Sequence, residues 1–502
     1  MDYIGEHLLP GRLGHFLVLL SFVASLVASI AYFKSANAKL TDVANSWKRL
    51  GRIAFIIDGL SVFSIFGLLI FIVATHKFEY YYAYNHSSKA LNFKYLLSCI
   101  WEGQEGSFLL WMMWHAVLGF ILIRISKQWE APVMTVFSIV QMCLATMILG
   151  LYFFEVKVGS NPFLLTRELY GAQGGVFFQR ADYLLHPNMQ DGQGLNQLLQ
   201  NYWMVIHPPV LFLGFASTLV PFAYAMAGLW KKNYGGWTKA ALPWALFSTC
   251  ILGTGIMMGA AWAYESLTFG GYWAWDPVEN ASLVPWLVMV AGLHTLVIYN
   301  ATGNSLRATY LFFILSFLLI LYSTYLTRSG DLVDTSVHAF TSTGLGWQLR
   351  IFVLVLLIPS VVLFIKRYKN IPFIAKEEST YSREFWMFIG SLVFFLSSMF
   401  IITATSLPVI NKIFNTNFAI GEDREFPYNP IQIFVAIVIG FLTATAQYLK
   451  YKDTARKYFL KKIALPTLIA LFLSALISIF GGINYNTYGA GYLAAIHLAI
   501  FA

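Results

Sequence analysis

Apolar runs of near-spanning length alternate with short polar segments along most of the chain. A helix that crosses a membrane needs about 20 consecutive apolar residues. The runs predict helices at 13–33, 53–74, 107–125, 132–154, 203–229, 240–262, 281–299, 308–327, 346–365, 385–406, 430–449 and 462–482, and a thirteenth begins near 488. The sequence therefore predicts an all-α polytopic integral membrane protein with about 13 transmembrane helices.

The composition supports a membrane protein. Of the 502 residues 58% are hydrophobic and only 11% are charged, whereas soluble proteins carry roughly 25% charged residues. The net charge of +9 comes from Lys and Arg between the apolar runs, so we expect no nucleic acid partner. The three cysteines form no CxxC pair, which argues against a disulfide scaffold, a thiol relay or a zinc site.

Basic residues lie mostly in one set of loops. These loops hold 22 of the 33 Lys and Arg residues, and such loops are typically cytoplasmic. The count therefore predicts an N-terminus outside the cytoplasm and four long outer loops, at 75–106, 155–202, 263–280 and 328–345.

The third outer loop is rich in aromatic residues. Six rings lie between Trp262 and Trp275 around Gly270 and Gly271, without Lys or Arg. An interfacial belt of Trp and Tyr is one explanation, and Asp276-Pro277-x-Glu279 also has the form of a capped helix start. The glycines allow close approach and the ring faces allow stacking, which favours a large planar apolar ligand such as a tetrapyrrole.

Histidines offer candidate ligands for a metal in such a ring. His207 lies at the outer start of the fifth predicted helix and His338 in the outer loop after the eighth, on either side of the aromatic loop, although an outer-loop histidine is commonly a solvated side chain. His294 and His497 fall inside apolar helices, where ionisable residues are rare. Each of these two could instead bond to a neighbouring helix. His115 also lies inside an apolar helix, but the sequence offers no obvious second histidine to share a metal with it.

The aromatic loop resembles the tryptophan-rich WWD signature of haem-handling proteins. Its extended form, 269–282 followed by Pro285-Trp286, is similar to the cytochrome c maturation protein F (CcmF) family. Further matches span most of the chain, at 105–111, 159–163, 194–200, 207–211, 327–330 and 336–340. The chain departs from the family at Phe269 and Tyr272, where tryptophan is common, and it ends at Ala502, where members usually continue.

The resemblance implies the membrane core of a haem lyase in the bacterial inner membrane, with a periplasmic N-terminus. Such a protein takes haem from a periplasmic haem chaperone and attaches it to the CxxCH thiols of apocytochrome c, beside thiol-reducing and chaperone subunits and membrane lipid. His207 and His338 would hold the incoming haem, and His294 and His497 a buried haem b that receives electrons from quinol. No residue is expected as a nucleophile. The implied haem platform comprises Trp262, Phe269, Gly270, Gly271, Tyr272, Trp273, Trp275, Asp276, Glu279, Asn280 and Trp286.

On this interpretation the chain has three parts. Helices one to four occupy 1–154, a haem-handling core with helices five to eight occupies 155–345, and the remaining helices occupy 346–502. Three alternatives stay open: a haem delivery or export protein of the same superfamily, a b-type respiratory membrane subunit, and a solute transporter.

Overall fold

The computed structural model describes residues 3–172, 174–266, 271–332, 336, 344–375, 379–421, 425–481 and 490–502. Its contacts divide the chain into two compact units, which are described separately. Unit 1 comprises Met1–Lys231, Cys250–Tyr272 and Thr343–Leu354, and unit 2 comprises Lys232–Thr249, Trp273–Ser342 and Val355–Ala502. The helices α9 (Thr238–Ser266) and α12 (Gly346–Arg367) each contribute residues to both units. The predicted three-part division of the chain stays a prediction.

Unit 1 is a helical bundle with short elements at its loops. Its remaining elements are α1 (Leu8–Asn37), α2 (Thr41–Ala74), α3 (Tyr81–His86), α4 (Phe93–Glu102), α5 (Gln104–Ile125), α6 (Glu130–Met147), β1 (Leu151–Phe153), β2 (Val156–Val158), α7 (Thr166–Ala172) and α8 (Tyr202–Trp230). Single-turn 3₁₀ helices lie at Lys127–Trp129, Val176–Gln179, Tyr183–Leu185, Pro187–Met189 and Gln197–Leu199.

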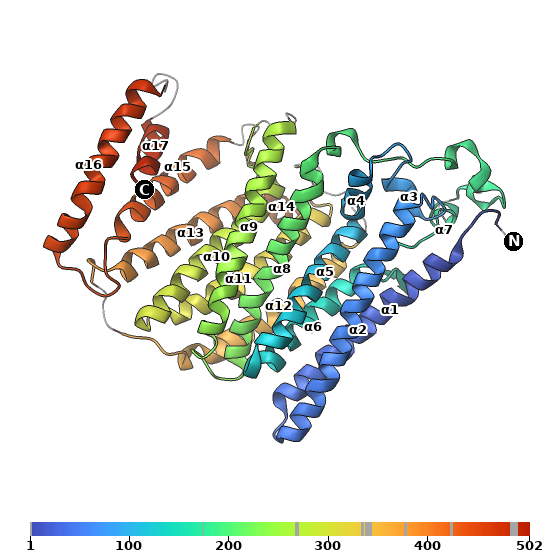
Figure 1. The fold of residues 1–502 in the computed structure, drawn as a ribbon, viewed down its shortest axis with the longest axis horizontal. Coiled ribbons are helices and arrows are strands. Elements are labelled where there is room, and N and C mark those ends of the chain that lie inside the picture. Colours follow the sequence, from blue (N-terminus) through green and yellow to red (C-terminus); the bar gives the residue numbers. More distant parts are fainter. Residues whose placement is uncertain are drawn as a thin grey trace. The chain divides into compact units, whose positions relative to one another are not determined.

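Helices α1 and α2 pack along each other as an antiparallel hairpin (Figure 1, blue). The face of α1 that is buried consists mainly of Gly, Ala and Ser, and small side chains allow helix backbones to approach closely. α2 begins at Thr41, 12 residues before the predicted span at 53, because the basic segment around Lys48 continues the helix. At 34 residues and 1.5 Å per residue, α2 is about 50 Å long.

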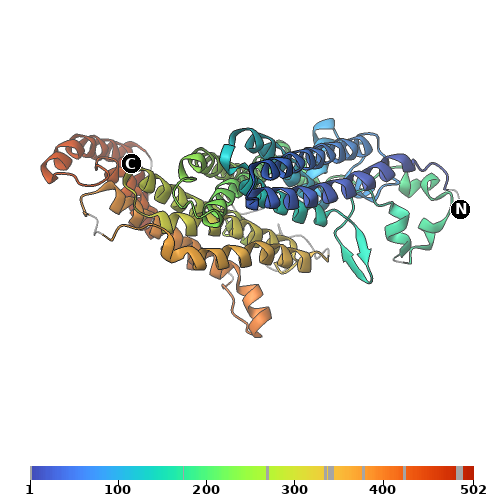
Figure 2. The same ribbon diagram turned by 90° about the horizontal axis from the view of Figure 1, so that it is seen from below.

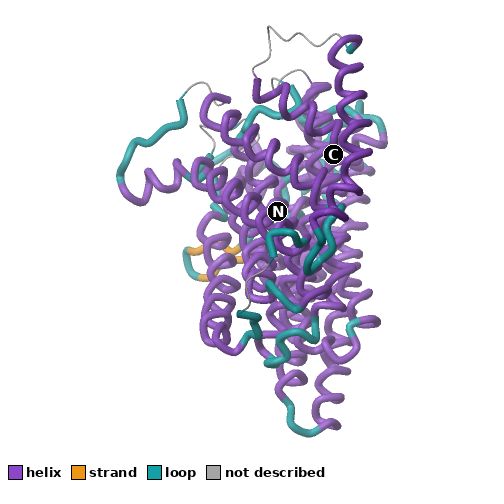
Figure 3. The backbone as a smooth tube through the Cα atoms, turned by 90° about the vertical axis from the view of Figure 1, so that its left-hand side faces the viewer, coloured by secondary structure: helices purple, strands orange, loops and turns teal. Residues whose placement is uncertain are grey.

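The segment after α6 is a β-hairpin, so the prediction of helix as far as 154 is wrong. α6 ends at Met147, and β1 pairs antiparallel with β2, with Tyr152 opposite Lys157. The hairpin is seen in Figures 2 and 3. The φ of Gly150 is +65, a left-handed value with which an α-helix cannot continue. The aromatic and β-branched residues that follow favour an extended backbone.

Unit 2 is a second helical bundle. It contains α10 (Pro277–Thr302), α11 (Leu306–Arg328), α13 (Arg383–Thr405), α14 (Leu407–Phe414), α15 (Glu425–Ala446), α16 (Arg456–Phe480), α17 (Ala490–Phe501) and a 3₁₀ turn at Tyr368–Asn370. α10 packs against α11 and α13, α13 against α15, and α15 against α17. The packing of α10 is close, because a Cβ added at Gly292 would lie 2.8 Å from the Phe313 ring.

Twelve helices of the described ranges are long and apolar enough to cross a membrane. The prediction of an all-α polytopic membrane protein is therefore confirmed. α17 is a shorter apolar helix of 12 residues, so the predicted thirteenth span is not confirmed. α14 was not predicted, since eight residues of mixed polarity produce no spanning pattern.

Candidate functional site

His207 lies in the second turn of α8, at the end of unit 1 where this helix begins. The Asn201 side chain caps the helix by accepting the Met204 N–H at 3.2 Å. Pro208 follows His207 and has no N–H, so the Met204 carbonyl four residues earlier loses its helical donor. The indole N–H of Trp101 donates to that carbonyl at 2.8 Å instead. Trp101 therefore replaces the helical hydrogen bond that Pro208 removes beside His207.

Helix α9 lies directly against His207. The imidazole ring meets the Trp262 ring edge to face, with centroids 5.8 Å apart. A Cβ added at Gly259 would lie 3.0 Å from Cε1 of His207, and one added at Gly255 would lie 2.8 Å from the Leu211 Cα. The glycines of α9 therefore let the two helices approach closely enough for His207 and Trp262 to touch.

The end of α9 presents further aromatic groups in unit 1. Tyr264 and Tyr272 stack with ring centroids 4.1 Å apart and planes 4° from parallel. Glu265 accepts the indole N–H of Trp203 at 2.8 Å, which ties the end of α9 to the start of α8. The indole N–H of Trp262 is buried and has no hydrogen-bond partner among the residues described.

In unit 2, the predicted capped helix start is present at α10. Asp276 accepts the Val278 N–H at 2.8 Å, and Glu279 accepts the N–H groups of Asp276 at 3.1 Å and Ala274 at 3.0 Å. Both acidic side chains therefore hold the backbone that follows Trp273. The Asn280 amide, which is fully buried, donates to the Trp275 carbonyl at 3.1 Å.

Trp275 is fixed by α15, a contact that the sequence did not suggest. Its indole N–H donates to Asn429 at 2.7 Å, and its ring stacks on Tyr428 at 4.8 Å with planes 9° from parallel. The stack therefore covers one ring face of Trp275, and Trp273 meets Trp275 edge to face at 6.0 Å.

The backbone and the helix start beside Trp275 are also held. The φ of Trp275 is +51, so its backbone is strained. The Ser336 hydroxyl donates to Asp276 at the start of α10, at 2.8 Å.

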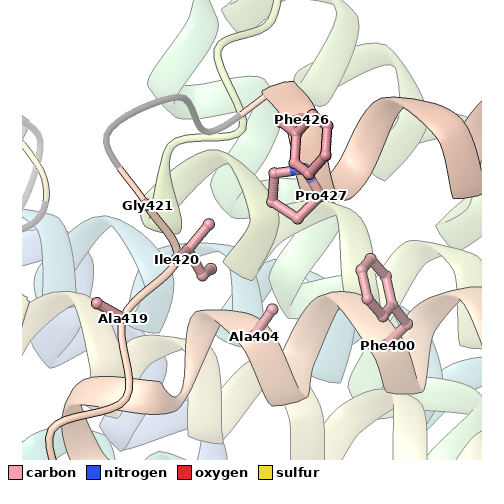
Figure 4. A pocket seen from close by; sticks show the side chains of 7 residues that line it. All are labelled: Phe400, Ala404, Ala419, Ile420, Gly421, Phe426 and Pro427. Atoms are coloured by element: carbon pink, nitrogen blue, oxygen red, sulfur yellow. The ribbon is translucent and has the colours of Figure 1, made fainter.

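An apolar pocket of about 530 Å³ lies next to this cluster in unit 2. Figure 4 shows side chains from α13, from the loop between α14 and α15 and from α15 around it, and these are Phe400, Ala404, Ala419, Ile420, Gly421, Phe426 and Pro427. Phe400 also meets Tyr428 edge to face at 5.6 Å. The pocket therefore shares one aromatic wall with the group that holds Trp275.

An ion pair lies beyond the end of α11. The Lys412 ammonium of α14 is 2.9 Å from Asp331 Oδ1, and the Tyr325 hydroxyl donates to the other oxygen at 2.6 Å. Burial raises the pKa of Asp331, but the hydrogen bonds from Tyr325 and Lys412 outweigh that effect. The pKa of Asp331 therefore lies below its ordinary value, and the carboxylate is charged at neutral pH.

The two intramembrane histidines have different neighbours. His294 of α10 lies 6.2 Å from the Phe394 ring of α13, and its Nδ1 is buried without a hydrogen-bond partner in the described ranges. His497 of α17 contacts Ser474 of α16 through Nδ1 and lies 3.5 Å from Ser478 through Nε2. Within the described part of the chain, no hydrogen bond or ring contact joins His294 to His497.

Several predicted site residues remain untested. Phe269, Gly270 and His338 lie outside the described residues, and Gly271 has φ +124 with open space beside it. Trp286 lies within α10 and donates to the Thr249 carbonyl at 2.9 Å, so a helix contact occupies its N–H. The proposed haem contacts of all these residues stay predictions.

The chain resembles proteins of cytochrome c biogenesis. Residues 101–332 match the cytochrome C assembly protein family. The chain is 31% identical over 461 residues to the cytochrome c-type biogenesis protein CcmF of Pseudomonas fluorescens, with 90% of this chain and 63% of that protein covered. With CcmF of Pseudomonas aeruginosa it shares 30% identity over 500 residues, or 97% of this chain and 69% of that protein.

A solved structure titled cytochrome c haem lyase CcmF has the same fold, with a TM-score of 0.71 at 21% identity, over all of this chain and 71% of that one. The chain is thus a multi-span membrane protein of the cytochrome c assembly class. It belongs to the CcmF family of cytochrome c-type biogenesis proteins. It spans about 63% of the P. fluorescens relative and 58% of a second relative, CcmF of Haemophilus influenzae.

Proposed function

We propose that this chain is the membrane core of a cytochrome c haem lyase, which holds haem as a substrate for attachment to the CxxCH thiols of apocytochrome c. The contact between His207 and Trp262 carries the proposal, because it places an imidazole beside a half-buried indole ring at the end of unit 1 where Tyr264 and Tyr272 also stack. Membership of the CcmF family supports the same reaction.

In this proposal His207 and His338 bind the iron of the incoming haem. Trp262, Tyr272, Trp273 and Trp275 supply ring surface, and the indole N–H groups of Trp262 and Trp273 are buried without a hydrogen-bond partner among the described residues. Asp276, Glu279 and Asn280 act through the backbone, since they hold the Ala274–Val278 segment.

The attachment adds the S–H of each cysteine across a haem vinyl group, and no leaving group is released. The protein therefore needs to position both reactants, and orientation alone can supply about 7–11 kcal/mol in well-aligned intramolecular reactions. No protein nucleophile is required.

The proposal also includes a permanently bound haem b, with His294 and His497 as its ligands and quinol as its electron donor. Two observations support these ligands: His294 has a buried Nδ1 without a partner in the described ranges, and His497 contacts Ser474 through Nδ1, so that Nε2 is the ring nitrogen that would bind iron. When bound, this haem would pass electrons that keep the substrate haem ferrous.

The partners and the membrane follow from the same proposal. We expect a periplasmic haem chaperone as haem donor, apocytochrome c with its thiol-reducing and chaperone subunits as acceptor, and quinol and lipid in a bacterial inner membrane. The bias of basic residues supports a periplasmic N-terminus, because 22 of the 33 Lys and Arg residues lie in the loops on the other side of the membrane from the N-terminus, and such loops are typically cytoplasmic.

The test uses absorption spectra of the purified full chain, before and after addition of haem. We expect His207→Ala and His338→Ala to lose binding of the added haem and to keep the resident b-type spectrum, and His294→Ala and His497→Ala to lose the resident spectrum. His186→Ala is the matched control, since this loop histidine packs on Phe177. Haem capture and holocytochrome c yield equal to wild type in His207→Ala would overturn the proposal.

A further inference from the structure

A buried carboxyl group lies inside unit 1, and the haem chemistry does not use it. Asp58 occurs within the apolar run of α2 and is 0% exposed. The Ser21 hydroxyl of α1 donates to Oδ1 of Asp58 at 2.6 Å, and Oδ2 is buried without a hydrogen-bond partner among the described residues. Ionisable groups within membrane helices are costly and commonly functional.

The surroundings of Asp58 are polar but carry no compensating cation. Gln141 of α6 is fully buried and is the second polar group that interacts with the carboxyl. No ion pair to Asp58 occurs within the ranges that the structure describes. A buried charge without a partner costs several kcal/mol, so this environment favours a carboxyl group that carries its proton.

Gln141 suits both forms of the carboxyl. A side-chain amide has an N–H₂ donor and a carbonyl acceptor, so it can donate to the carboxylate or accept from the acid. Its Oε1 is buried without a hydrogen-bond partner in the described residues, while its Nε2 donates to the Met112 carbonyl at 3.3 Å. Gln141 therefore carries a buried acceptor oxygen that no described group uses.

Buried hydroxyl groups lead from Asp58 towards one end of the bundle. On successive turns of α1, Ser21, Ser25 and Tyr32 are fully buried and Ser29 is 7% exposed. Each serine hydroxyl that donates to its own helix keeps lone pairs that can accept a proton. The row ends where Arg52 of α2 holds Glu130 of α6 through two contacts of 2.6 Å.

The helices that pack around Asp58 carry further ionisable groups. These are Tyr32 in α1, His115 in α5, Glu130 in α6 and Arg52 in α2 itself. His115 is fully buried and lies against Phe137 of α6 at 5.7 Å. The short helices α3 and α4 meet α2 at its other end. Arg52 is six residues from Asp58, a rise of about 9 Å along α2.

We propose that Asp58 is an intramembrane proton-binding site, which exchanges its proton through the α1 hydroxyls with the end of unit 1 that carries Arg52 and Glu130. One proton enters at that end and each hydroxyl passes one on, so that the Asp58 carboxylate becomes the neutral acid. No electron moves and no bond to carbon changes. This proposal does not rest on the proposed haem lyase activity.

Infrared spectroscopy of the full chain in lipid nanodiscs tests the site, because a protonated carboxyl has a C=O stretching band that ionised carboxylates lack. We expect this band near neutral pH in the wild type and its loss in Asp58→Asn, while Asp331→Asn, at an ion-paired carboxylate, keeps the band. Ser21→Ala should keep the band at a shifted frequency, since one hydrogen bond is lost. A wild type without the band, or an Asp58→Asn variant that retains it, would overturn the proposal.

The route is tested by transfer into D₂O, which shifts the same band as the proton exchanges. Tyr32→Phe removes the last hydroxyl of the row and should slow this shift. Ser64→Ala is the matched control, because Ser64 is an exposed hydroxyl of α2 that bonds to the Leu60 carbonyl. Equal exchange rates in the wild type and Tyr32→Phe would contradict the proposed route.

Discussion

The position of Trp275 depends on Asn429, which lies 154 residues further along the chain. Asn429→Ala removes the acceptor of the indole N–H and leaves the stack on Tyr428. A hydrogen bond between neutral groups contributes about 0.5–1.5 kcal/mol, and more is lost when a buried donor stays unpaired. Because Asn429 is only partly buried, we expect a loss of about 1 kcal/mol.

That energy corresponds to a roughly fivefold weaker preference for the observed Trp275 position. We therefore expect about fivefold weaker binding of added haem and a reduced near-ultraviolet circular dichroism signal from tryptophan. Tyr428→Leu removes a stack that contributes about 0.5–1.5 kcal/mol, so the double variant should bind haem about 30-fold more weakly than the wild type.

Two variants separate this effect from other contacts of Asn429. Asn429→Asp keeps an acceptor oxygen and, when combined with Glu425→Ala so that two carboxylates do not meet, should bind haem like the wild type. Glu425→Ala removes the partner of the Asn429 amide, which lies 3.1 Å away, and should have little effect. An Asn429→Ala variant with wild-type haem affinity and an unchanged tryptophan signal would refute the idea that α15 positions Trp275.

Three further predictions concern other parts of the chain. Gly259→Val should displace His207 and weaken binding of added haem while the resident b-type spectrum is unchanged, and an unaltered affinity would show that the close approach is not required. Because the pKa of Asp331 is lowered in the folded state, its stabilising effect is present above about pH 4 and is lost as the pH falls through its folded value. Thermal midpoints between about pH 2 and 4 should therefore depend on pH less in Asp331→Asn than in the wild type, and equal slopes would contradict this. Gly51→Leu should lower the thermal midpoint by disrupting α1 against α2, since an added Cβ would lie 2.9 Å from the Tyr32 ring, and an unchanged midpoint would contradict this close packing.

The apolar runs predicted the membrane helices because a lipid-exposed backbone must bond to itself, which leaves spanning helices as the simplest solution. The start of α10 was also predictable, since Asp276, Pro277 and Glu279 form a local capping pattern. The hydrogen bond from Trp275 to Asn429 was not predictable, because the segment around Asn429 has no recognisable motif and the two residues are far apart in sequence. Asp58 was missed for the same reason: a single carboxyl in an apolar run does not identify Ser21 or Gln141 as its neighbours.

The start of α8 shows how a distant side chain can compensate for a proline, and the idea can be tested by a double-mutant cycle. Trp101→Phe leaves the Met204 carbonyl without its donor and should lower the free energy of unfolding by about 1 kcal/mol. Pro208→Ala supplies a backbone N–H four residues after Met204, so the carbonyl no longer depends on Trp101. Trp101→Phe should therefore cost much less in the Pro208→Ala background, as measured by thermal unfolding in nanodiscs. Additive effects of the two substitutions would mean that Trp101 stabilises this end of unit 1 by packing alone, because only a shared hydrogen-bond acceptor couples the two positions.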